Sequence, residues 1–177
     1  MWNHRWEYNK VPETFFRAVY ALADEGLDFG LLLLGRSFRN QPQEFLEARQ
    51  QLAERVVHLG YAPDAAAYSR LLWQADVVVS TAMHDFFGAA VVEACYCGCF
   101  PVLPRRLAYP ELILVAHHEA CLYDDFEGLL ARLRYAITRI QPIRGFSLQE
   151  HMARFDWKQM VPVYDAALAL LVKGRSG

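Results

Sequence analysis

Two carboxylates, Asp85 and Glu93, flank the junction between a predicted strand and a predicted helix. The strand is a run of three valines that ends at Ser80, and an apolar segment restarts at Gly88 after a short polar and aromatic loop. This order is typical of strand, loop and helix in an α/β sheet. The free N–H groups at the start of such a helix favour a bound anion, and a nearby acidic side chain can accept sugar hydroxyls. The stretch therefore indicates a phosphate-and-sugar site.

Each carboxylate also has a structural explanation. Glu93 is surrounded by apolar residues, so it is either a partly buried carboxylate that needs partners or an exposed side chain on the one polar stripe of its helix. Asp85 is either a ligand-binding residue or the N-cap of a helix whose first residue is Phe86. His84, which directly precedes Asp85, either hydrogen-bonds the ligand or orders the loop. The residue types alone leave these alternatives open.

Arg5 and Lys10 are the predicted source of positive charge for a diphosphate. The sequence contains no G-x-G-x-x-G, no P-loop motif and no D-x-D, so neither a glycine-rich cradle nor a carboxylate pair for Mg²⁺ is expected. A bound diphosphate would then need fixed protein charges, and Arg5 and Lys10 lie in a predicted loop just before the first helix. The alternative is that both are solvated surface charges, as most Lys and Arg side chains are.

The histidines and cysteines predict no metal site. Four possible ligands are close in sequence: His117, His118, Glu119 and Cys121. Adjacent side chains point apart, however, and no second pair of ligands stands at metal spacing. The three clustered cysteines, Cys95, Cys97 and Cys99, would be small buried side chains at a helix end rather than a disulfide framework. We therefore expect neither a metal nor another cofactor.

Composition and charge limit the class of protein. The 177 residues, 54% of them hydrophobic, can form one substantial core, so we expect a single domain over residues 1–177. A net charge of −2 gives no general attraction to nucleic acid or to an anionic membrane. The sequence has no apolar run near the roughly 20 residues of a membrane span, and no signal-peptide pattern at its start. These features predict a cytoplasmic protein.

Helices and strands are predicted to alternate along almost the whole chain. Continuous apolar runs, typical of buried parallel strands, predict strands at 29–34, 77–79, 99–103 and 120–123, and a further short strand is expected at 55–59. Helices are expected at 11–26, 42–53, 63–74, 88–98, near 109–111, and at 124–139 and 157–173. Residues 141–147 are expected to be loose. The sequence thus predicts an α/β fold, a Rossmann-like parallel sheet with helices on both faces.

The start of the chain offers little sequence for a first strand. A parallel sheet should begin with a strand, but Trp2 and Asn3 could form no more than the tail of one before the helix at 11–26. We therefore expect one domain of a longer protein, cut at an element boundary.

The arrangement resembles the donor-binding, C-terminal half of retaining GT-B glycosyltransferases of group 1 (family 4-like). Asp85 and Glu93 match the E-x7-E signature of that family, with Asp in place of the first Glu. The segment from Cys97 to Val102 is similar to the family's A-x-G-x-P-V strand. Arg5 and Lys10 resemble the pair that stabilises the leaving diphosphate. The resemblance implies transfer of a hexose from a nucleoside-diphosphate sugar, without metal, once an acceptor-binding N-terminal domain, absent from this chain, is present.

The resemblance also implies roles for further residues. The substrate would be contacted around the signature, by Asp85, Phe86, Phe87, Gly88 and Glu93, with His84 as a weaker candidate. Leu59, Gly60 and Tyr61 resemble the loop that lies along the nucleotide base. The leaving phosphate would be stabilised by the two basic residues and by the backbone N–H groups around Phe87 and Gly88.

Three strings, NHRWEYNK, HDFFG and EACYCGCFPV, are similar to a subgroup of glycosyltransferase-like-domain proteins associated with α-mannosyl transfer to queuosine in tRNA. That resemblance implies GDP-mannose as donor and tRNA as acceptor. An RNA-binding surface should carry clustered Lys and Arg. Such a cluster is approached only by Arg105, Arg106, Arg132, Arg134 and Arg139.

Other functions are compatible with the same sequence. The chain could be a non-catalytic nucleotide-binding or scaffold domain, because fold does not determine chemistry. It could belong to a glycosyltransferase with another donor and a glycan or lipid acceptor, or to a sugar-nucleotide epimerase of similar architecture. Convergence of Arg5, Lys10, Asp85 and Glu93 on one cleft would favour the enzyme.

Overall fold

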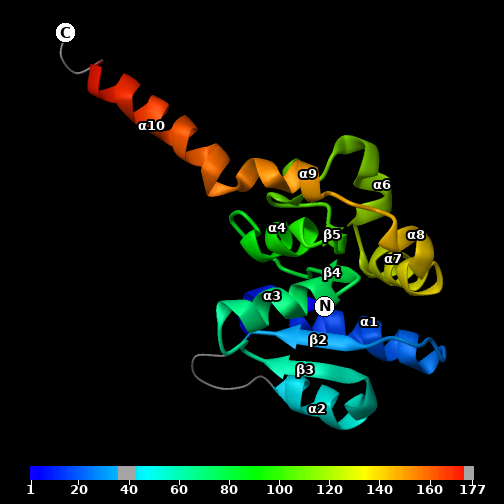
Figure 1. The fold of residues 1–177 in the computed structure, drawn as a ribbon. Coiled ribbons are helices and arrows are strands. Elements are labelled where there is room, and N and C mark those ends of the chain that lie inside the picture. Colours follow the sequence, from blue (N-terminus) through cyan, green and yellow to red (C-terminus); the bar gives the residue numbers. More distant parts are fainter. Residues whose placement is uncertain (36–42, 174–177) are drawn as a thin grey trace.

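A parallel β-sheet forms the centre of the molecule (Figure 1). The computed structural model describes residues 1–35 and 43–173. Its strands are β1 (Trp2–Asn3), β2 (Leu31–Leu34), β3 (Val56–Gly60), β4 (Val77–Val79), β5 (Phe100–Pro104) and β6 (Leu122–Tyr123). They lie in the order β3-β2-β1-β4-β5-β6, and all neighbours run parallel. The predicted α/β fold with a Rossmann-like parallel sheet is confirmed.

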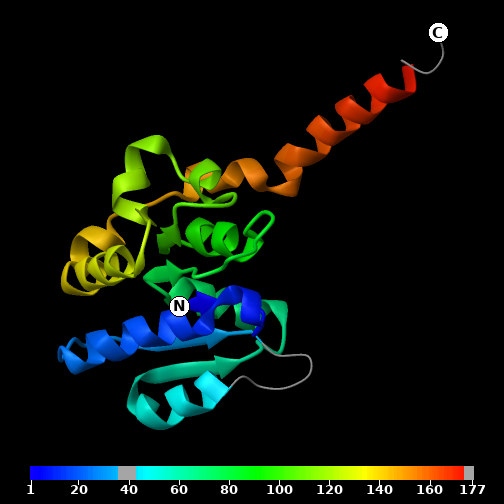
Figure 2. The ribbon, with the colours of Figure 1, turned by 180° about the vertical axis from the view of Figure 1, so that it is seen from behind.

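Helices cover both faces of the sheet. The α-helices are α1 (Pro12–Asp24), α2 (Gln43–Gln51), α3 (Ala65–Gln74), α4 (Ala89–Tyr96), α5 (Tyr109–Leu112), α6 (His118–Cys121), α7 (Phe126–Thr138), α8 (Ile140–Arg144), α9 (Gln149–Met152) and α10 (Trp157–Lys173). Helix α1 contacts α2 and α7, whereas α4 contacts α3 and α9. Figure 1 shows α3 in front of the sheet, and the view from behind in Figure 2 shows α1 on the opposite face.

The two-residue strand β1 lies at the centre of the sheet. Trp2 is fully buried and pairs with Leu33 on one side and Val79 on the other. Strand β2 beside it consists of four leucines, all buried, because helices pack on both of its faces. The strand at Trp2–Asn3 is thus as short as expected. Its pairing with β2 and β4 places it at the centre of the sheet.

Several predicted boundaries were wrong. Ala120 and Cys121 are helical rather than extended, because the chain makes the short helix α6 before it reaches β6. Residues 140–144 form α8, although the stretch 141–147 was expected to be loose. Pro142 at the third position of α8 is compatible with a helix, because its missing N–H would have no intrahelical partner there. The predicted start of a helix at residue 42 lies outside the described residues.

Helix α10 extends away from the rest of the molecule (Figures 1 and 2). Its sequence predicts a helix with an apolar face, and the structure leaves that face exposed. Exposed apolar side chains recur at intervals of four and three residues, at Trp157, Val161, Tyr164, Leu168 and Leu171. This spacing places them on one side of the helix. No helix within residues 1–35 or 43–173 is long and apolar enough to cross a membrane.

Candidate functional site

The predicted site residues gather where the strand order reverses. Strands β1 and β4 are neighbours in space, and the chain continues outward from them in opposite directions across the sheet. Ligands of open α/β sheets bind beyond the carboxyl ends of the strands at such a switch point. Arg5 and Lys10 follow β1, and Asp85 follows β4. The topology therefore brings two segments about 80 residues apart in sequence to one edge of the sheet.

Backbone and side-chain hydrogen bonds join the two loops. The hydroxyl of Thr81 donates to the carbonyl oxygen of Lys10 at 2.8 Å and accepts from the indole N–H of Trp2 at 3.2 Å. The N–H of Met83 donates to the carbonyl oxygen of Asn9 at 2.9 Å. Because the bonds of Thr81 are buried, water cannot readily replace them. They fix the backbone of Lys10 against the loop that follows β4.

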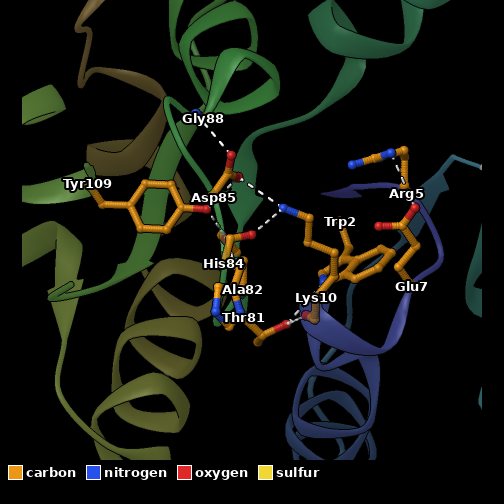
Figure 3. A network of polar contacts seen from close by, with 11 residues as sticks. Trp2, Arg5, Glu7, Lys10, Thr81, Ala82, His84, Asp85, Gly88 and Tyr109 are labelled. Atoms are coloured by element: carbon orange, nitrogen blue, oxygen red, sulfur yellow. Dashed lines mark hydrogen bonds and ion pairs between the residues drawn. The ribbon is translucent and has the colours of Figure 1, made fainter. Parts of the chain in front are cut away.

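Lys10 points into this loop from the β1 side (Figure 3). Its side chain is only 9% exposed, and its Nζ donates to the carbonyl oxygen of His84 at 2.6 Å. The same Nζ lies 3.5 Å from Oδ2 of Asp85. A lysine is almost never buried unless it is paired, so these two contacts account for its position. The alternative that Lys10 is a solvated surface charge was wrong.

The backbone directly after Lys10 is strained. Lys10 ends a 3-10 turn (Tyr8–Lys10), and Val11 follows with φ of 49° before Pro12 begins α1. A β-branched residue in this left-handed region is a genuine outlier, and such conformations cost roughly 1 to 3 kcal/mol. The sharp turn directs the chain from the end of β1 into α1 while Lys10 faces the neighbouring loop.

Arg5 is not part of the same cluster. Its side chain is 63% exposed, and its Nη1 lies 3.3 Å from Oε1 of Glu7 in its own loop. In Figure 3 the guanidinium of Arg5 is separate from Lys10 and Asp85, and the interaction drawn from it goes to Glu7. Arg5 therefore lies at the same edge of the sheet, but the structure does not bring it to the two carboxylates of the signature.

Asp85 connects the start of α4 with Lys10. Its Oδ1 accepts from the N–H of Gly88 at 3.2 Å, and its Oδ2 accepts from the hydroxyl of Tyr109 at 2.9 Å. The alternative that Asp85 is a helix N-cap, with Phe86 as the first helical residue, was wrong, because the N-cap is Gly88. The carboxylate instead closes the turn before the helix. The N–H of Gly88, expected to bind phosphate, is thus already bonded.

The first turn of α4 still offers backbone donors. Gly88 has φ of 82°, a conformation suited to glycine, and its carbonyl oxygen accepts from the N–H groups of Val91 and Val92. The hydrogen bonds among residues 1–35 and 43–173 leave the N–H groups of Ala89 and Ala90 without an acceptor. These two donors at the positive end of the helix are the ones suited to an anion.

Tyr109 supports the loop from beneath and was not identified from the sequence. It is fully buried at the start of α5, and its hydroxyl lies 2.7 Å from Oγ of Ser80. Burial raises the pKa of the Tyr109 phenol, so it remains a hydrogen-bond donor to Asp85. A Cβ on Gly88 would lie 3.1 Å from the ring of Tyr109, so the ring also packs closely on the N-cap of α4.

Glu93 is exposed on α4 and reaches the end of β1 through another tyrosine. Its Oε2 accepts from the hydroxyl of Tyr68 at 2.6 Å, and that hydroxyl accepts from Nδ2 of Asn3 at 2.8 Å. Burial, followed by the hydrogen bond to Glu93, raises the pKa of Tyr68. Of the two alternatives for Glu93, the exposed side chain is the correct one, and its carboxylate is held by the hydroxyl of Tyr68.

His4 is a buried titratable residue directly after β1. Burial, followed by the charge of Lys10, lowers the pKa of His4 to about 3. Its ring lies edge-on to Trp2, with centroids 4.9 Å apart, and its Nε2 has no hydrogen-bond partner within the described part of the chain. The imidazole is therefore neutral at pH 7. The sequence offered no sign of this residue, because an isolated His in a loop has no distinctive pattern.

The remaining predicted residues surround this centre. Gly60 ends β3 at the same edge of the sheet, and its carbonyl oxygen accepts from the N–H of Gly35 at 3.1 Å; the adjacent Tyr61 is exposed. Phe86 is fully exposed, whereas Phe87 packs edge-to-face on Phe155, with centroids 5.1 Å apart. The side chain of His84 is exposed, and it is the backbone carbonyl of this residue that contacts Lys10.

The cysteines and histidines lie apart from this centre. Cys95, Cys99 and Cys121 are buried and Cys97 is half-buried; all four are free thiols, as small core side chains should be. His118 directs its Nε2 to the carbonyl oxygens of Pro110 and Ile113, each at 3.0 Å. Across residues 1–35 and 43–173, no group of three or more His, Cys, Asp or Glu side chains is placed to hold a metal ion.

Two of the five arginines considered for RNA binding, Arg105 and Arg134, are paired with acidic side chains. Arg105 lies 2.8 Å from Glu119 and 3.3 Å from Asp124. Arg134 makes two hydrogen bonds to Glu25, at 2.7 and 2.6 Å. These pairs neutralise much of the positive charge that the sequence placed on this part of the surface.

The comparisons with known proteins agree with the fold. The sequence profile of the glycosyl transferases group 1 family matches residues 3–139. The tRNA-queuosine alpha-mannosyltransferase of Drosophila melanogaster is 33% identical over 171 residues, which cover 93% of this chain and 43% of that protein. A GDP-mannose-dependent alpha-(1-6)-phosphatidylinositol dimannoside mannosyltransferase of Mycobacterium tuberculosis is 28% identical, with 98% of this chain and 44% of that protein covered.

The fold matches solved structures to a similar extent. A crystal structure of Anabaena HepE in complex with UDP and glucose superposes with a TM-score of 0.76 at 20% identity, covering 95% of this chain and 47% of that one. The chain thus spans less than half the length of these relatives. Because the family profile matches most of the sequence and the sheet matches GT-B structures, the chain belongs to the group 1 glycosyltransferases.

Proposed function

We propose that this chain is the donor-binding half of a retaining glycosyltransferase that transfers mannose from GDP-mannose to queuosine in tRNA, without a metal ion. The observation that supports the donor site best is the meeting of Lys10 and Asp85, 3.5 Å apart, at the switch point between β1 and β4. A fixed ammonium and a helix N-terminus at one edge of the sheet suit a diphosphate leaving group.

The proposed chemistry uses the charges already in place. When the bond between the anomeric carbon and the diphosphate oxygen breaks, the electron pair stays on the phosphate, and the sugar acquires positive charge. Lys10 and the N–H groups of Ala89 and Ala90 stabilise the phosphate charge as it develops. The oxygen of the acceptor hydroxyl then bonds to the anomeric carbon on the face that the phosphate leaves, and its proton passes to the departing phosphate.

The two mannosyltransferase relatives support mannose and GDP as the donor. The Mycobacterium enzyme is described as GDP-mannose-dependent, and the Drosophila enzyme acts on tRNA queuosine. In this proposal Glu93, fixed by Tyr68 at the end of β1, accepts the ribose hydroxyls. Gly60 and Tyr61 at the end of β3 lie beside the base.

The exposed apolar side of α10 supports a second half of the enzyme. Five exposed apolar side chains on one side of a helix are a typical contact surface for another domain. The relatives contain more than half of their length outside the region that this chain matches. We propose that an acceptor-binding domain of this kind packs against α10 and completes the site.

A thermal-shift screen tests the donor. The 177-residue chain is heated with GDP, UDP and ADP and with GDP-mannose, UDP-glucose and ADP-glucose. The proposal expects the guanosine nucleotides to raise the melting temperature most, because a ligand that binds only the folded state stabilises it. Absence of a shift with every nucleotide would overturn the donor-site assignment and favour a scaffold domain. A larger shift with UDP or ADP compounds would reject GDP-mannose alone.

A lipid or glycan acceptor is the second candidate. It is favoured by the Mycobacterium relative, whose name gives a phosphatidylinositol dimannoside as the acceptor, and by the paired arginines on the surface. The two acceptors are separated by a transfer assay with an enzyme that contains both halves. Radiolabelled mannose is offered together with queuosine-containing tRNA, the same tRNA lacking queuosine, and a lipid-linked dimannoside. Label in the queuosine-containing tRNA alone supports the first proposal, and label in the lipid supports the second.

A further inference from the structure

The Asp85 carboxylate is shared among three donors. Oδ1 accepts from the N–H of Gly88 at 3.2 Å, and Oδ2 accepts from the hydroxyl of Tyr109 at 2.9 Å. The third donor, Nζ of Lys10, is 3.5 Å from Oδ2. A charge-assisted hydrogen bond between an ammonium and a carboxylate is normally about 2.7 to 2.9 Å long. The Lys10–Asp85 pair is therefore the longest contact of the three, although both side chains are largely buried.

The position of Tyr109 explains this long contact. Its hydroxyl binds the same carboxylate oxygen that faces Lys10, while its ring packs on Gly88, the residue whose N–H binds the other oxygen. The carboxylate is thus held on the α4 and α5 side of the site (Figure 3). The ammonium of Lys10 makes its short hydrogen bond to a neutral carbonyl, that of His84, at 2.6 Å.

Tyr109 itself cannot easily move. Its hydroxyl also bonds Oγ of Ser80 at 2.7 Å, at the end of β4. Helix α5 and its C-cap residue Ile113 are fixed through their backbone carbonyls, which accept from three side chains of later elements. His118 bonds Pro110 and Ile113, His151 bonds Leu112, and Arg154 bonds Glu111, each at 3.0 Å. The phenol is therefore a rigid donor aimed at Asp85.

We infer that Tyr109 is a positioning residue that holds the Asp85 carboxylate away from Lys10, so that the Lys10 ammonium is free to bind the donor diphosphate. This inference rests on the proposed donor site. A tight ion pair between Lys10 and Asp85 would compete with phosphate for the ammonium, because a carboxylate and a phosphate oxygen use the same donors. Asp85, one methylene shorter than the Glu of the family signature, is reached by Tyr109 and by Gly88 at once.

Tyr109→Phe tests the inference, because it removes the hydroxyl and keeps the ring against Gly88. Binding to the 177-residue chain is measured by calorimetry with the nucleoside diphosphate that gives the largest thermal shift, and with the corresponding nucleoside. We expect the affinity for the diphosphate to fall by about threefold to tenfold, as for one hydrogen bond, and the affinity for the nucleoside to stay unchanged. A purely structural role would weaken both ligands together.

Tyr123→Phe is the matched control. Its hydroxyl is also buried and donates to the carbonyl oxygen of Ser80 at 2.8 Å, but it does not touch Asp85. We expect Tyr123→Phe to lower the melting temperature as Tyr109→Phe does, while the affinity for the diphosphate stays at the wild-type value. An equal loss of diphosphate affinity in both variants would overturn the inference.

The double variant shows whether Tyr109 acts through Asp85. In an Asp85→Asn background no carboxylate competes for Lys10, so adding Tyr109→Phe should cause no further loss of diphosphate affinity. The same loss in both backgrounds would overturn the inference, as would wild-type diphosphate binding by Tyr109→Phe. A wild-type chain that binds no nucleotide would overturn the proposed function, and this inference with it. The two failures are therefore distinguishable.

Discussion

Lys10 and Arg5 follow the same strand, five residues apart, yet they differ in almost every physical respect. Lys10 is buried, and its contacts cross from the loop after β1 to the loop after β4. Arg5 is mostly exposed and pairs with Glu7 inside its own loop. A charge fixed before the ligand arrives needs little reorganisation in the transition state, whereas a mobile charge must first be ordered. The spacing in the sequence predicted that Arg5 and Lys10 act as a pair. In the structure, however, Lys10 is buried and Arg5 is exposed.

The largest effect should come from Lys10→Ala. Removal of one fixed charge at a developing oxyanion costs about 2.7 to 4 kcal/mol, so turnover of an enzyme with both halves should fall about a hundred- to a thousandfold. The fold should persist, because Asp85 keeps its bonds to Gly88 and Tyr109. Circular dichroism and thermal unfolding check the fold, and a transfer assay checks turnover. Near-normal turnover would remove Lys10 from the mechanism.

The stability of the folded chain should also depend on pH, through the buried His4. Burial lowers the folded pKa of His4 to about 3, below the ordinary histidine value of 6.5, so the unfolded chain binds the proton first as the pH falls. Stability from this group is present above about pH 6.5 and is lost as pH falls towards 3, by ~2 kcal/mol between pH 7 and pH 5. In His4→Phe an aromatic ring that cannot be protonated replaces the imidazole, so this loss should disappear. Urea unfolding at pH 7 and at pH 5 measures the free energy of unfolding of both proteins. An equal loss of stability between the two pH values in wild type and in His4→Phe would show that folding does not lower the pKa of His4.

Arg5→Ala should have a smaller effect than Lys10→Ala. An exposed ion pair contributes about 0 to 1 kcal/mol, so stability should hardly change. If Arg5 turns to the diphosphate only when the donor is bound, turnover should fall about tenfold, as for one partly ordered charge-assisted bond. The measurement is the same transfer assay, with Arg49→Ala, an exposed arginine in α2, as the control. An equal loss of turnover in Arg5→Ala and Lys10→Ala would show that burial does not distinguish the roles of the two residues.

Glu93→Gln should have the smallest effect on binding. The amide can still accept from the hydroxyl of Tyr68, so the local structure should remain, while a charged acceptor for the ribose is lost. We expect nucleotide affinity to fall by about threefold to tenfold, measured by calorimetry. The 2′-deoxynucleotide should show little or no further loss in this variant. Unchanged affinity would return Glu93 to the role of a surface residue.

Most of the fold could be predicted because its strands are continuous apolar runs. The four leucines of β2 and the valines of β4 indicated buried parallel strands, and the predicted helices between them were found. The central strand β1 was recognisable only as a fragment, because two residues carry no periodicity. The connection between β5 and α6, residues 105–117, contains α5, and no pattern in it signals that the first residue of this helix, Tyr109, is fully buried.

The site was predictable in part for a related physical reason. Asp85 and Glu93 stand out because the residues around them are mostly apolar, and the topology brought them and Lys10 to one edge of the sheet. The residues that hold them are tyrosines, Tyr109 and Tyr68, which look like ordinary core residues in the sequence. The role of each tyrosine depends on the position of its hydroxyl group. That position is set by packing between elements that are far apart in the sequence.

The left-handed conformation of Val11 affects both the stability of the chain and the position of Lys10. Glycine at this position would adopt φ of 49° without a clash, and part of its gain would be offset by a more flexible unfolded chain. Val11→Gly should therefore raise the melting temperature, equivalent to ~1 kcal/mol, and should at the same time loosen the turn that aims Lys10. If Val11→Gly melts at a higher temperature but binds diphosphate more weakly, then Val11 keeps the turn before α1 rigid and lowers the thermal stability of the chain.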